Sequence, residues 1–415
     1  MIFVLLVLII AGFLFVTTNP SFMFKKSIHK DAKKYSTRHC LVFYPDNKEG
    51  KKIAKQMCDG VEDDRIFDYS LVPYGDYYLV SYGNGYEYFV DKEYNSISIN
   101  EVSDFGRRII FDYLRYTIKK EQPDKYYDAK FLADLTIDSI NFDEVTYDIY
   151  QEYLKCSIPS FGLDVLVPLK YMQKEIGMNF NFMDETYVKP VYIDKEHPVI
   201  ALTFDDGPQL WYSPNESASV QIVDTLYKYD ANATFYVTGY ALEERDEWTE
   251  SELKEFLNKS ITNGNTFGSH TQNHDKLLDL TAENIGKAIN GPANILKNLV
   301  GYNMLTYRPP GGAYSDSMIA ASPLPAIYWD IDSQDWQTES PEEIAQNVLK
   351  HNFDDGDVVL FHEIYHETAK SLETLLPELI NRGCQLVSVE DMLNYLGINP
   401  ATLKYYYNYV PKNYE

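Results

Sequence analysis

The chain has 415 residues, of which 45% are hydrophobic, so it is long enough for two folded units and apolar enough to give each a core. It carries 62 acidic and 37 basic side chains, which gives a formal net charge of -25. This charge repels the phosphates of nucleic acids, and nucleic-acid binding is therefore excluded from the expected functions.

The four cysteines form no C-x-x-C pair and show no spacing typical of a zinc knuckle. A disulfide between Cys40 and Cys58 remains open. Cys384 begins an alternating apolar run, and we expect it to be a small buried core residue.

The N-terminus, Met1 to Val16, is an unbroken run of apolar residues and glycine, as a helix inside a bilayer requires. It is close to the lower limit of about 17 residues for a membrane span. A cleaved signal peptide is the alternative, but no small-x-small cleavage site follows the run, so we favour a membrane anchor over residues 1–19. Basic residues follow the run, and by the positive-inside tendency they favour a main domain in the cytoplasm. Long domains can be translocated regardless of this charge, so we nevertheless expect the main domain to lie outside the cell.

Residues 20–40 are basic and polar and are predicted to be a linker. Residues 41–190 are rich in tyrosine and are predicted to form a smaller α+β domain. Two alternating segments, 77–82 and 86–90, flank a glycine-containing turn and predict a β-hairpin. Apolar residues at helical spacing predict a helix between Val102 and Lys120.

Residues 191–415 show short apolar strands alternating with helices, which predicts βαβ units, a parallel sheet and the α/β class. The predicted strands are Val199–Phe204, Ala233–Val237, Thr266–Gly268, Met304–Tyr307, Ala326–Ile331, Val358–Phe361 and Gln385–Val389. The predicted helices are Ser217–Tyr229, Glu250–Thr262, Ala282–Leu299, Pro341–Lys350 and Ala369–Arg382. A closed or nearly closed β/α barrel follows, with its chemistry at the carboxyl ends of the strands.

Polar motifs follow two of these strands. Asp205 and Asp206 come directly after the first strand, and a cation would relieve the repulsion between their carboxylates. A solvated Asp-Gly turn is the alternative for this motif alone. His270 and His274 follow the third strand, and one helical turn would place both imidazoles on one side. Two histidines and an aspartate leave metal positions open for water and substrate, which indicates a catalytic site.

With these motifs in place, the segment from Pro198 to Leu396 resembles carbohydrate esterase family 4, the NodB-type polysaccharide deacetylases. Three further motifs carry the resemblance in order, namely Arg308-Pro309-Pro310-Gly311-Gly312, Asp332-Ser333-Gln334-Asp335-Trp336 and Leu360-Phe361-His362. The resemblance implies a NodB-type distorted (β/α) barrel of about seven parallel strands. It makes residues 191–415 the catalytic domain and leaves a spacing or wall-binding role for residues 41–190.

The resemblance also implies a role for each matching residue. Asp206, His270 and His274 would bind the metal, Asp205 would be the general base and His362 the general acid. Arg308 would orient Asp205, and Asp332 would pair with His362 and tune its pKa. Trp336 and Leu360 would form an apolar slot for the acetyl methyl group, and the Gly311 N–H would stabilise the oxyanion. The family usually has a tyrosine at Gly311 and an aspartate at Glu363.

These roles predict metal-dependent removal of N-acetyl groups from a cell-wall amino-sugar polymer, with release of acetate. Peptidoglycan N-acetylglucosamine is the leading substrate; N-acetylmuramic acid, chitin-type oligomers and xylan esters are alternatives. Zinc is the expected metal, although cobalt, nickel or manganese suit the same ligands. The sequence leaves the oligomeric state open.

Two other functions compete with this one. The segment His362-Glu363-Ile364-Tyr365-His366 spells H-E-x-x-H, the zincin protease motif, but that motif acts in the middle of a helix and here follows a strand pattern. A non-catalytic wall-binding module of the same fold is the second alternative, and it does not explain why every metal and proton-transfer residue is present.

Overall fold

A computed structural model of the chain describes residues 33–36, 40–44, 47–59, 67–74, 77–82, 86–90, 102–149, 153–172, 187–210, 217–243 and 248–407. Within these ranges, no helix combines the length and the apolar character needed to cross a membrane. The predicted anchor, residues 1–19, lies outside the described residues, as do the side chains of Cys40 and Cys58. The described residues fall into two compact units, which lie within Met1–Tyr113 with Ile137–Glu185 and within Leu114–Thr136 with Thr186–Glu415.

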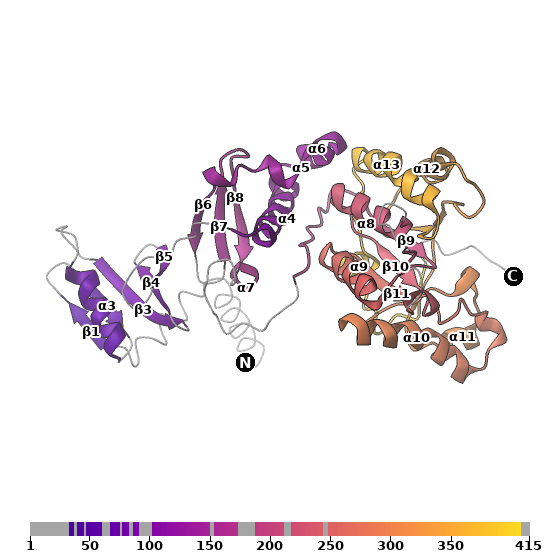
Figure 1. Ribbon diagram of the computed structural model, residues 1–415, viewed down its shortest axis with the longest axis horizontal. Coiled ribbons are helices and arrows are strands. Elements are labelled where there is room, and N and C mark those ends of the chain that lie inside the picture. The colour runs from indigo at the N-terminus through magenta and orange to yellow at the C-terminus, as the bar shows by residue number, and fades with distance from the viewer. Residues whose placement is uncertain are drawn as a thin grey trace, which may run out of the picture. The chain divides into compact units, whose positions relative to one another are not determined.

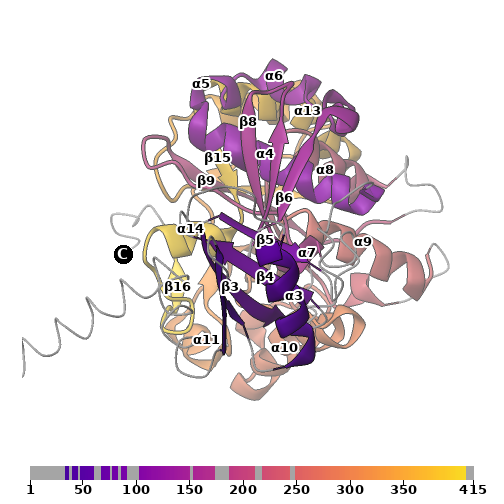
Figure 2. The same ribbon diagram turned by 90° about the vertical axis from the view of Figure 1, so that its left-hand side faces the viewer.

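The first unit contains two small sheets. The five-stranded sheet has the order β1-β2-β3-β4-β5 and comprises β1 (Lys33–Ser36), β2 (Cys40–Tyr44), β3 (Phe67–Tyr74), β4 (Tyr77–Tyr82) and β5 (Tyr86–Val90). Helix α3 (Lys48–Asp59) packs on one face of this sheet through Ile53, Ala54 and Met57, which are buried (Figure 2). The predicted hairpin is confirmed, because β4 and β5 pair in antiparallel register from Tyr82–Tyr86 to Tyr78–Val90.

The second sheet of this unit is an antiparallel meander. It comprises β6 (Thr146–Ile149), β7 (Tyr153–Ile158) and β8 (Leu163–Pro168), and α7 (Leu169–Met172) follows it. Alternate residues of β7 and β8 are buried, as expected for strands with one face on a core. The short 3₁₀ turns Ile137–Ser139 and Phe142–Glu144 precede it.

The predicted helix at residues 102–120 is confirmed as α4 (Asp104–Glu121). Its last residues, together with α5 (Pro123–Tyr126) and α6 (Ala129–Asp134), belong to the second unit. Arg115 donates hydrogen bonds to the carbonyls of Tyr227 (2.7 Å) and Lys228 (3.2 Å), and it is itself 2% exposed. The second unit therefore includes a segment that precedes residue 191 by more than 50 residues in the sequence.

The second unit is built on a parallel sheet with the order β11-β10-β9-β14-β13, and β15 also pairs with β9. Its strands are β9 (Val199–Asp205), β10 (Thr234–Val237), β11 (Thr266–Ser269), β13 (Ile331–Asp332), β14 (Val358–His362) and β15 (Gln385–Val387). Helices flank these strands (Figure 1), namely α8 (Ala218–Lys228), α9 (Glu250–Thr262), α10 (Ala282–Val300), α11 (Asp316–Ala321), α12 (Pro341–Leu349), α13 (His366–Asn381) and α14 (Val389–Tyr395). The α/β class and the parallel sheet are confirmed.

Two of the predicted strands differ from the structure. The segment Met304–Tyr307 contributes only single bridges from Tyr307, because the chain reaches Pro309 and Pro310, which cannot donate to a ladder. The predicted strand Ala326–Ile331 is split in two. Its first residues form β12 (Ala326–Ile327), which pairs with a strand that the sequence did not predict, β16 (Tyr405–Tyr406), whereas β13 pairs with β14.

Aromatic side chains in the core of the second unit hold its three central strands together. Every residue of β9 is buried, as expected for a central parallel strand covered on both faces. Phe204 of β9 stacks between Phe235 of β10 and Phe361 of β14, with ring centroids 5.2 and 5.3 Å apart. Each of these buried rings contributes about 1.5–3 kcal/mol to stability. The carboxyl ends of three neighbouring strands are thus held in register.

Candidate active site

Two adjacent aspartates end the central strand. Asp205 is the last residue of β9 and is 3% exposed, and Asp206 follows with a φ of 78°. The Asp206 N–H donates to the Tyr236 carbonyl of β10, and the Asp205 carbonyl accepts from the Glu363 N–H, both at 3.1 Å. The strands on either side therefore fix the turn that carries both carboxylates.

The two histidines reach the same place through an irregular loop and not through the predicted helical turn. Thr271 and His274 have φ values of 69° and 53°, which an α-helix excludes. The Ser269 hydroxyl accepts from the Thr271 N–H at 3.2 Å, and the Thr271 hydroxyl accepts from the Asp275 N–H at 2.7 Å. Such side-chain bonds to the backbone compete with a helix, so the helical expectation was wrong although the rings of His270 and His274 lie 5.1 Å apart.

The ligand atoms of Asp206, His270 and His274 converge. Asp206 Oδ1 lies 3.5 Å from His270 Nε2 and 3.6 Å from His274 Nε2. Atoms bound at about 2.0–2.1 Å in a tetrahedral zinc site stand about 3.4 Å apart, so these separations suit one ion. Asp206 Oδ1 is buried without a hydrogen-bond partner among the described residues, which leaves it available to a cation. This is the one such cluster in the described part of the chain.

His270 is held in the form that a metal requires. Its Nδ1 lies 2.9 Å from the Arg308 carbonyl oxygen, and because a carbonyl only accepts, Nδ1 carries the proton. Its Nε2 therefore keeps a lone pair, which faces Asp206. Burial lowers the pKa of His270 to about 3, so the ring is neutral at pH 7.

Asp205 is oriented by a buried arginine. Arg308 is completely buried, and its Nη1 donates to Asp205 Oδ1 at 3.0 Å and to the Thr203 hydroxyl at 2.6 Å. Its other nitrogens donate to the carbonyls of Ile327 and Tyr328 at 3.0 and 3.1 Å. Burial raises the pKa of Asp205 above its usual range, although Arg308 opposes the shift. A carboxylate with a raised pKa is a stronger base, and this one is fixed in place.

His362 pairs with Asp335 and not, as predicted, with Asp332. Its Nδ1 lies 2.8 Å from Asp335 Oδ1, and its backbone N–H donates to Asp335 Oδ2 at 2.7 Å. The Thr368 hydroxyl donates to the same Asp335 oxygen at 2.7 Å. Asp332 instead accepts from the Gln334 N–H at 2.8 Å. Because Gln334 has a φ of 56°, the chain turns after β13 and brings the second aspartate of the motif, not the first, to His362.

The pairing sets the charge of His362. Burial opposes a charge on the ring, but the hydrogen bond to Asp335 and the negative charges of Asp335 and Asp205 outweigh it and raise the pKa of His362 to about 9. His362 and Asp205 are also register partners at the ends of β14 and β9, so both side chains leave the same face of the sheet. A protonated imidazole therefore stands beside a carboxylate base.

The three remaining predicted residues are placed as follows. Gly311 lies in a 3₁₀ turn with a φ of 63°, which a tyrosine adopts only with strain, and its N–H makes no hydrogen bond to any described residue. Leu360 is buried in β14, and Trp336 is 54% exposed beyond Asp335. Their contacts with an acetyl group remain predictions.

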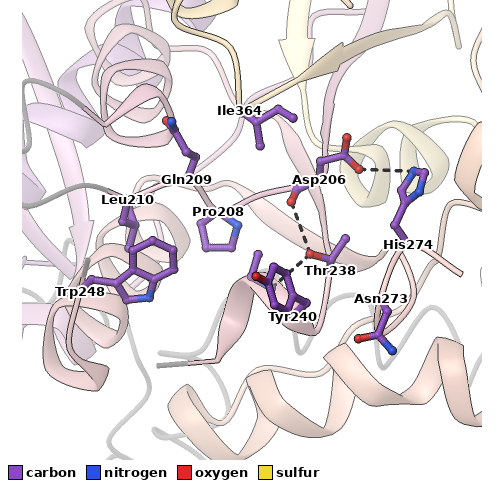
Figure 3. A pocket seen from close by; sticks show the side chains of 11 residues that line it. Asp206, Pro208, Gln209, Leu210, Thr238, Tyr240, Trp248, Asn273, His274 and Ile364 are labelled. Atoms are coloured by element: carbon purple, nitrogen blue, oxygen red, sulfur yellow. Dashed lines mark hydrogen bonds and ion pairs between the residues drawn. The ribbon is translucent and has the colours of Figure 1, made fainter. Parts of the chain in front are cut away.

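A cleft of about 590 Å³ opens beside the candidate metal ligands Asp206 and His274. Its lining residues are Asp206, Pro208, Gln209, Leu210, Thr238, Tyr240, Ala241, Trp248, Asn273, His274 and Ile364. Figure 3 shows Asp206 and His274 at one end of the cleft and Leu210 and Trp248 at the other. The sequence reasoning missed Thr238, Tyr240 and Trp248, although Thr238 and Tyr240 follow a predicted strand just as the aspartates do.

The H-E-x-x-H segment does not have the zincin geometry. His362 ends strand β14, whereas His366 is the first residue of α13, so the two histidines do not share a helical face. The described metal-ligand cluster contains neither of them.

Comparison with known proteins decides the family. A family model described as "Polysaccharide deacetylase" matches residues 193–323. A peptidoglycan-N-acetylglucosamine deacetylase of Bacillus cereus is 30% identical over 211 residues, which are 49% of this chain and 92% of that protein. The chain belongs to the polysaccharide deacetylase family. The matched model covers the ligands Asp206, His270 and His274.

Longer relatives share the same segment of this deacetylase-family chain. The peptidoglycan-N-acetylmuramic acid deacetylase PdaC of Bacillus subtilis is 32% identical over 200 residues, 48% of this chain and 40% of that protein. The peptidoglycan-N-acetylglucosamine deacetylase PgdA of Listeria monocytogenes is 31% identical over 198 residues, 48% of this chain and 39% of that protein. The chain thus matches less than half the length of these two relatives. A solved structure of PdaC aligns with 49% of this chain and 94% of its own, with 31% identity and a TM-score of 0.44.

Proposed function

We propose that this chain hydrolyses the N-acetyl groups of peptidoglycan N-acetylglucosamine and releases acetate. The observation that carries the proposal is the arrangement around one point: the base Asp205 and the imidazole of His362 leave the same sheet face, and three convergent metal ligands stand beside them. Hydrolysis of an amide needs a base for water, stabilisation of the oxyanion and an acid for the leaving amine.

The chain's own residues supply the proton transfers. Asp205 takes a proton from the attacking water, and Arg308 holds its carboxylate in position. His362, kept protonated by Asp335, gives a proton to the amine nitrogen as the amide C–N bond breaks. We further propose that the Gly311 N–H, which makes no hydrogen bond to a described residue, donates to the oxyanion. Asp206, His270 and His274 would hold a divalent ion, which would supply Lewis-acid polarisation and a lowered pKa of water.

Zinc is the metal that we propose for the site, because two imidazoles and one carboxylate with open positions match catalytic zinc sites. Cobalt, nickel and manganese suit the same ligand types, so loading the metal-free protein with each in turn ranks them.

The choice of peptidoglycan is supported by the relatives, whose names specify N-acetylglucosamine for the Bacillus cereus and Listeria proteins and N-acetylmuramic acid for PdaC. The cleft adds aromatic and amide side chains suited to a sugar, namely Tyr240, Trp248 and Asn273. We further propose that residues 1–19 anchor the chain in the membrane and that the catalytic unit acts outside the cell.

The test is acetate release from purified peptidoglycan, with and without a chelator, followed by mass spectrometry of the digested fragments. Each missing acetyl group then identifies its sugar. Chelator-sensitive acetate release with loss from N-acetylglucosamine supports the proposal. Loss of acetyl groups from N-acetylmuramic acid alone would mean that this sugar, and not N-acetylglucosamine, is the substrate. If no acetylated polymer releases acetate, the proposal is wrong and the non-catalytic binding module is favoured.

A further inference from the structure

Three tyrosines form an exposed aromatic surface outside the cleft. Tyr314, Tyr405 and Tyr407 are 48%, 46% and 36% exposed, and we call them the tyrosine patch. Tyr405 begins β16 and Tyr407 directly follows it, and both are exposed whereas Tyr406 between them is buried. Tyr406 donates a hydrogen bond to the Gly356 carbonyl at 2.9 Å and so fixes the strand.

The patch is rigid because its rings support one another. The Tyr314 and Tyr405 rings meet edge to face with centroids 5.7 Å apart. The Tyr407 ring stacks on the buried Tyr328 with centroids 5.4 Å apart, and Tyr328 also contacts Tyr314 at 6.4 Å. The Tyr314 hydroxyl donates to Asp316 at 2.9 Å. Rings held in this way lose little conformational entropy when a ligand binds.

The patch lies at the catalytic edge of the sheet. β12 and β16 are parallel, and Tyr328 and Tyr407 both follow their carboxyl ends, the edge at which Asp205 and His270 also lie. Arg308, which binds Asp205, donates to the Tyr328 carbonyl.

The patch is also tied to the loop that carries Gly311. The Tyr328 hydroxyl donates to the Ala313 carbonyl at 2.8 Å, and Tyr314 is the next residue of that loop. A continuous chain of contacts therefore runs from the catalytic base through Arg308 and Tyr328 to the tyrosine patch.

We propose that the tyrosine patch binds the glycan chain next to the sugar that loses its acetyl group, as an additional substrate-binding surface. The inference rests on the proposed function, because it assigns this surface to the same polymer. Tyrosine suits such a ligand, since its ring packs against the apolar face of a pyranose while its hydroxyl bonds sugar hydroxyls. Contiguous exposed aromatic surface is uncommon on soluble proteins and marks an interaction site. Binding energy gained here anchors a long polymer at the catalytic centre.

The test uses the full chain in two separate assays. The first is cosedimentation with insoluble peptidoglycan, and the second is acetate release from N-acetylated oligosaccharides of increasing length. We expect Tyr405→Ala and Tyr314→Ala each to weaken binding to the polymer and to raise KM for long oligomers by roughly three- to tenfold, with little change in kcat. The increase should shrink as the oligomer is shortened.

Two matched variants distinguish the loss of an aromatic ring from a general loss of folded structure. Tyr405→Phe keeps the ring and should keep most of the binding. Leu305→Ala removes a side chain that is also exposed, at 47%, but lies at the start of the segment leading to Tyr307, away from the carboxyl edge, and should leave both assays unchanged.

The two assays distinguish failure of the inference from failure of the proposed function. If the wild-type chain releases acetate but the alanine variants bind the polymer and turn it over like wild type, the patch has no part in substrate binding. If the wild-type chain binds the polymer through the patch but releases no acetate, the proposed function fails, and only the glycan-binding role of the patch stands. If the alanine variants change only self-association on a sizing column, the patch is an interface between copies and the inference is overturned.

Discussion

The second unit contains two clusters of buried charge that differ in how their charges are satisfied. At the carboxyl ends of the strands, Asp206 keeps a buried oxygen that makes no hydrogen bond to a described residue and lies 3.5 and 3.6 Å from the Nε2 atoms of His270 and His274. Just before β10, Asp230 is fully paired: Lys189 donates to it at 2.8 Å and the Tyr126 hydroxyl at 3.0 Å. Lys119 lies over the Tyr126 ring beside them.

The difference shows how a site is distinguished from a structural ion network in this fold. Burial raises the pKa of Asp230, but Lys189 and Arg115 outweigh it and hold that pKa below its usual range. Both oxygens of the Asp230 carboxylate therefore have partners within the chain, and this carboxylate needs no ligand. The cluster at the carboxyl ends leaves a buried carboxylate oxygen without a hydrogen bond to a described residue, which favours a cation site and is typical of catalytic centres.

The largest effect on activity is expected in the cluster at the carboxyl ends of the strands, which we call the unsatisfied cluster (Asp205, Asp206, His270 and His274). Asp205→Asn removes the base but none of the three metal ligands, so we expect metal binding to persist while kcat falls roughly 10²- to 10⁴-fold. His270→Ala should lose both metal and activity, because it removes a ligand. Metal content by atomic absorption and acetate release are measured on the same samples.

The control for both variants is His366→Ala, which removes the second histidine of the H-E-x-x-H segment. It should keep metal and activity, because His366 begins α13 and is not in the ligand cluster. Loss of metal in His366→Ala, with metal and full activity retained in His270→Ala, would reverse the assignment.

The second cluster, which we call the paired cluster, comprises Asp230, Lys189, Tyr126 and Lys119. Substitutions in it should lower the free energy of unfolding. Lys189→Met leaves the Asp230 carboxylate buried without its cation, and we expect it to destabilise the chain by roughly 3–5 kcal/mol. The matched control is Lys228→Met, which breaks an exposed ion pair with Glu373 of the same 2.8 Å length and should cost less than about 1 kcal/mol. Chemical denaturation measures both. Equal losses in the two variants would show that burial does not distinguish these pairs.

The sequence predicted the unsatisfied cluster better than the paired one. Asp205, Asp206, His270 and Arg308 follow strand patterns, and the carboxyl ends of parallel strands meet at one edge, so their convergence was predictable. The paired cluster joins Lys119 to Asp230 across more than 100 residues. Periodicity predicted the helix that carries Lys119 but not the surface on which that helix packs.

Errors within the site have local causes. Asp332 and Asp335 are three residues apart beside a two-residue strand, and the backbone at Gln334 decides which one meets His362. Residues 405–406 have high β propensity as tyrosines, but two residues are too few for an alternating pattern to predict a strand, and the pairing with β12 defines this one.

A pH profile sharpens the assignment of Asp335. His362 must be protonated to act as the acid, so activity falls as the pH rises through its pKa, which Asp335 raises from 6.5 to about 9. In Asp335→Asn the alkaline limb of the kcat profile should move toward 6.5, and kcat at pH 8 should fall roughly ten- to 100-fold. Asp332→Asn should leave that limb in place, because Asp332 bonds only its own turn. A shift in Asp332→Asn alone would restore the sequence-based pairing.

The last prediction concerns Glu363, a buried carboxyl that, unlike Asp230, has no cationic partner among the described residues. It packs against Gly207, where an added Cβ would overlap the carboxyl group, and burial raises its pKa from 4.5 to about 8. A folded-state pKa above the unfolded value means that the folded chain binds the proton more tightly, so this contribution to stability is complete below about pH 4.5 and is lost as the pH rises through about 8. Glu363→Gln keeps the shape and cannot ionise, and between pH 5 and pH 9 chelator-treated wild type should therefore lose roughly 1–4 kcal/mol more than the variant. Parallel denaturation midpoints across that range would mean that Glu363 is solvated or has a partner in the folded chain, and would contradict its assignment as an unpaired buried carboxyl.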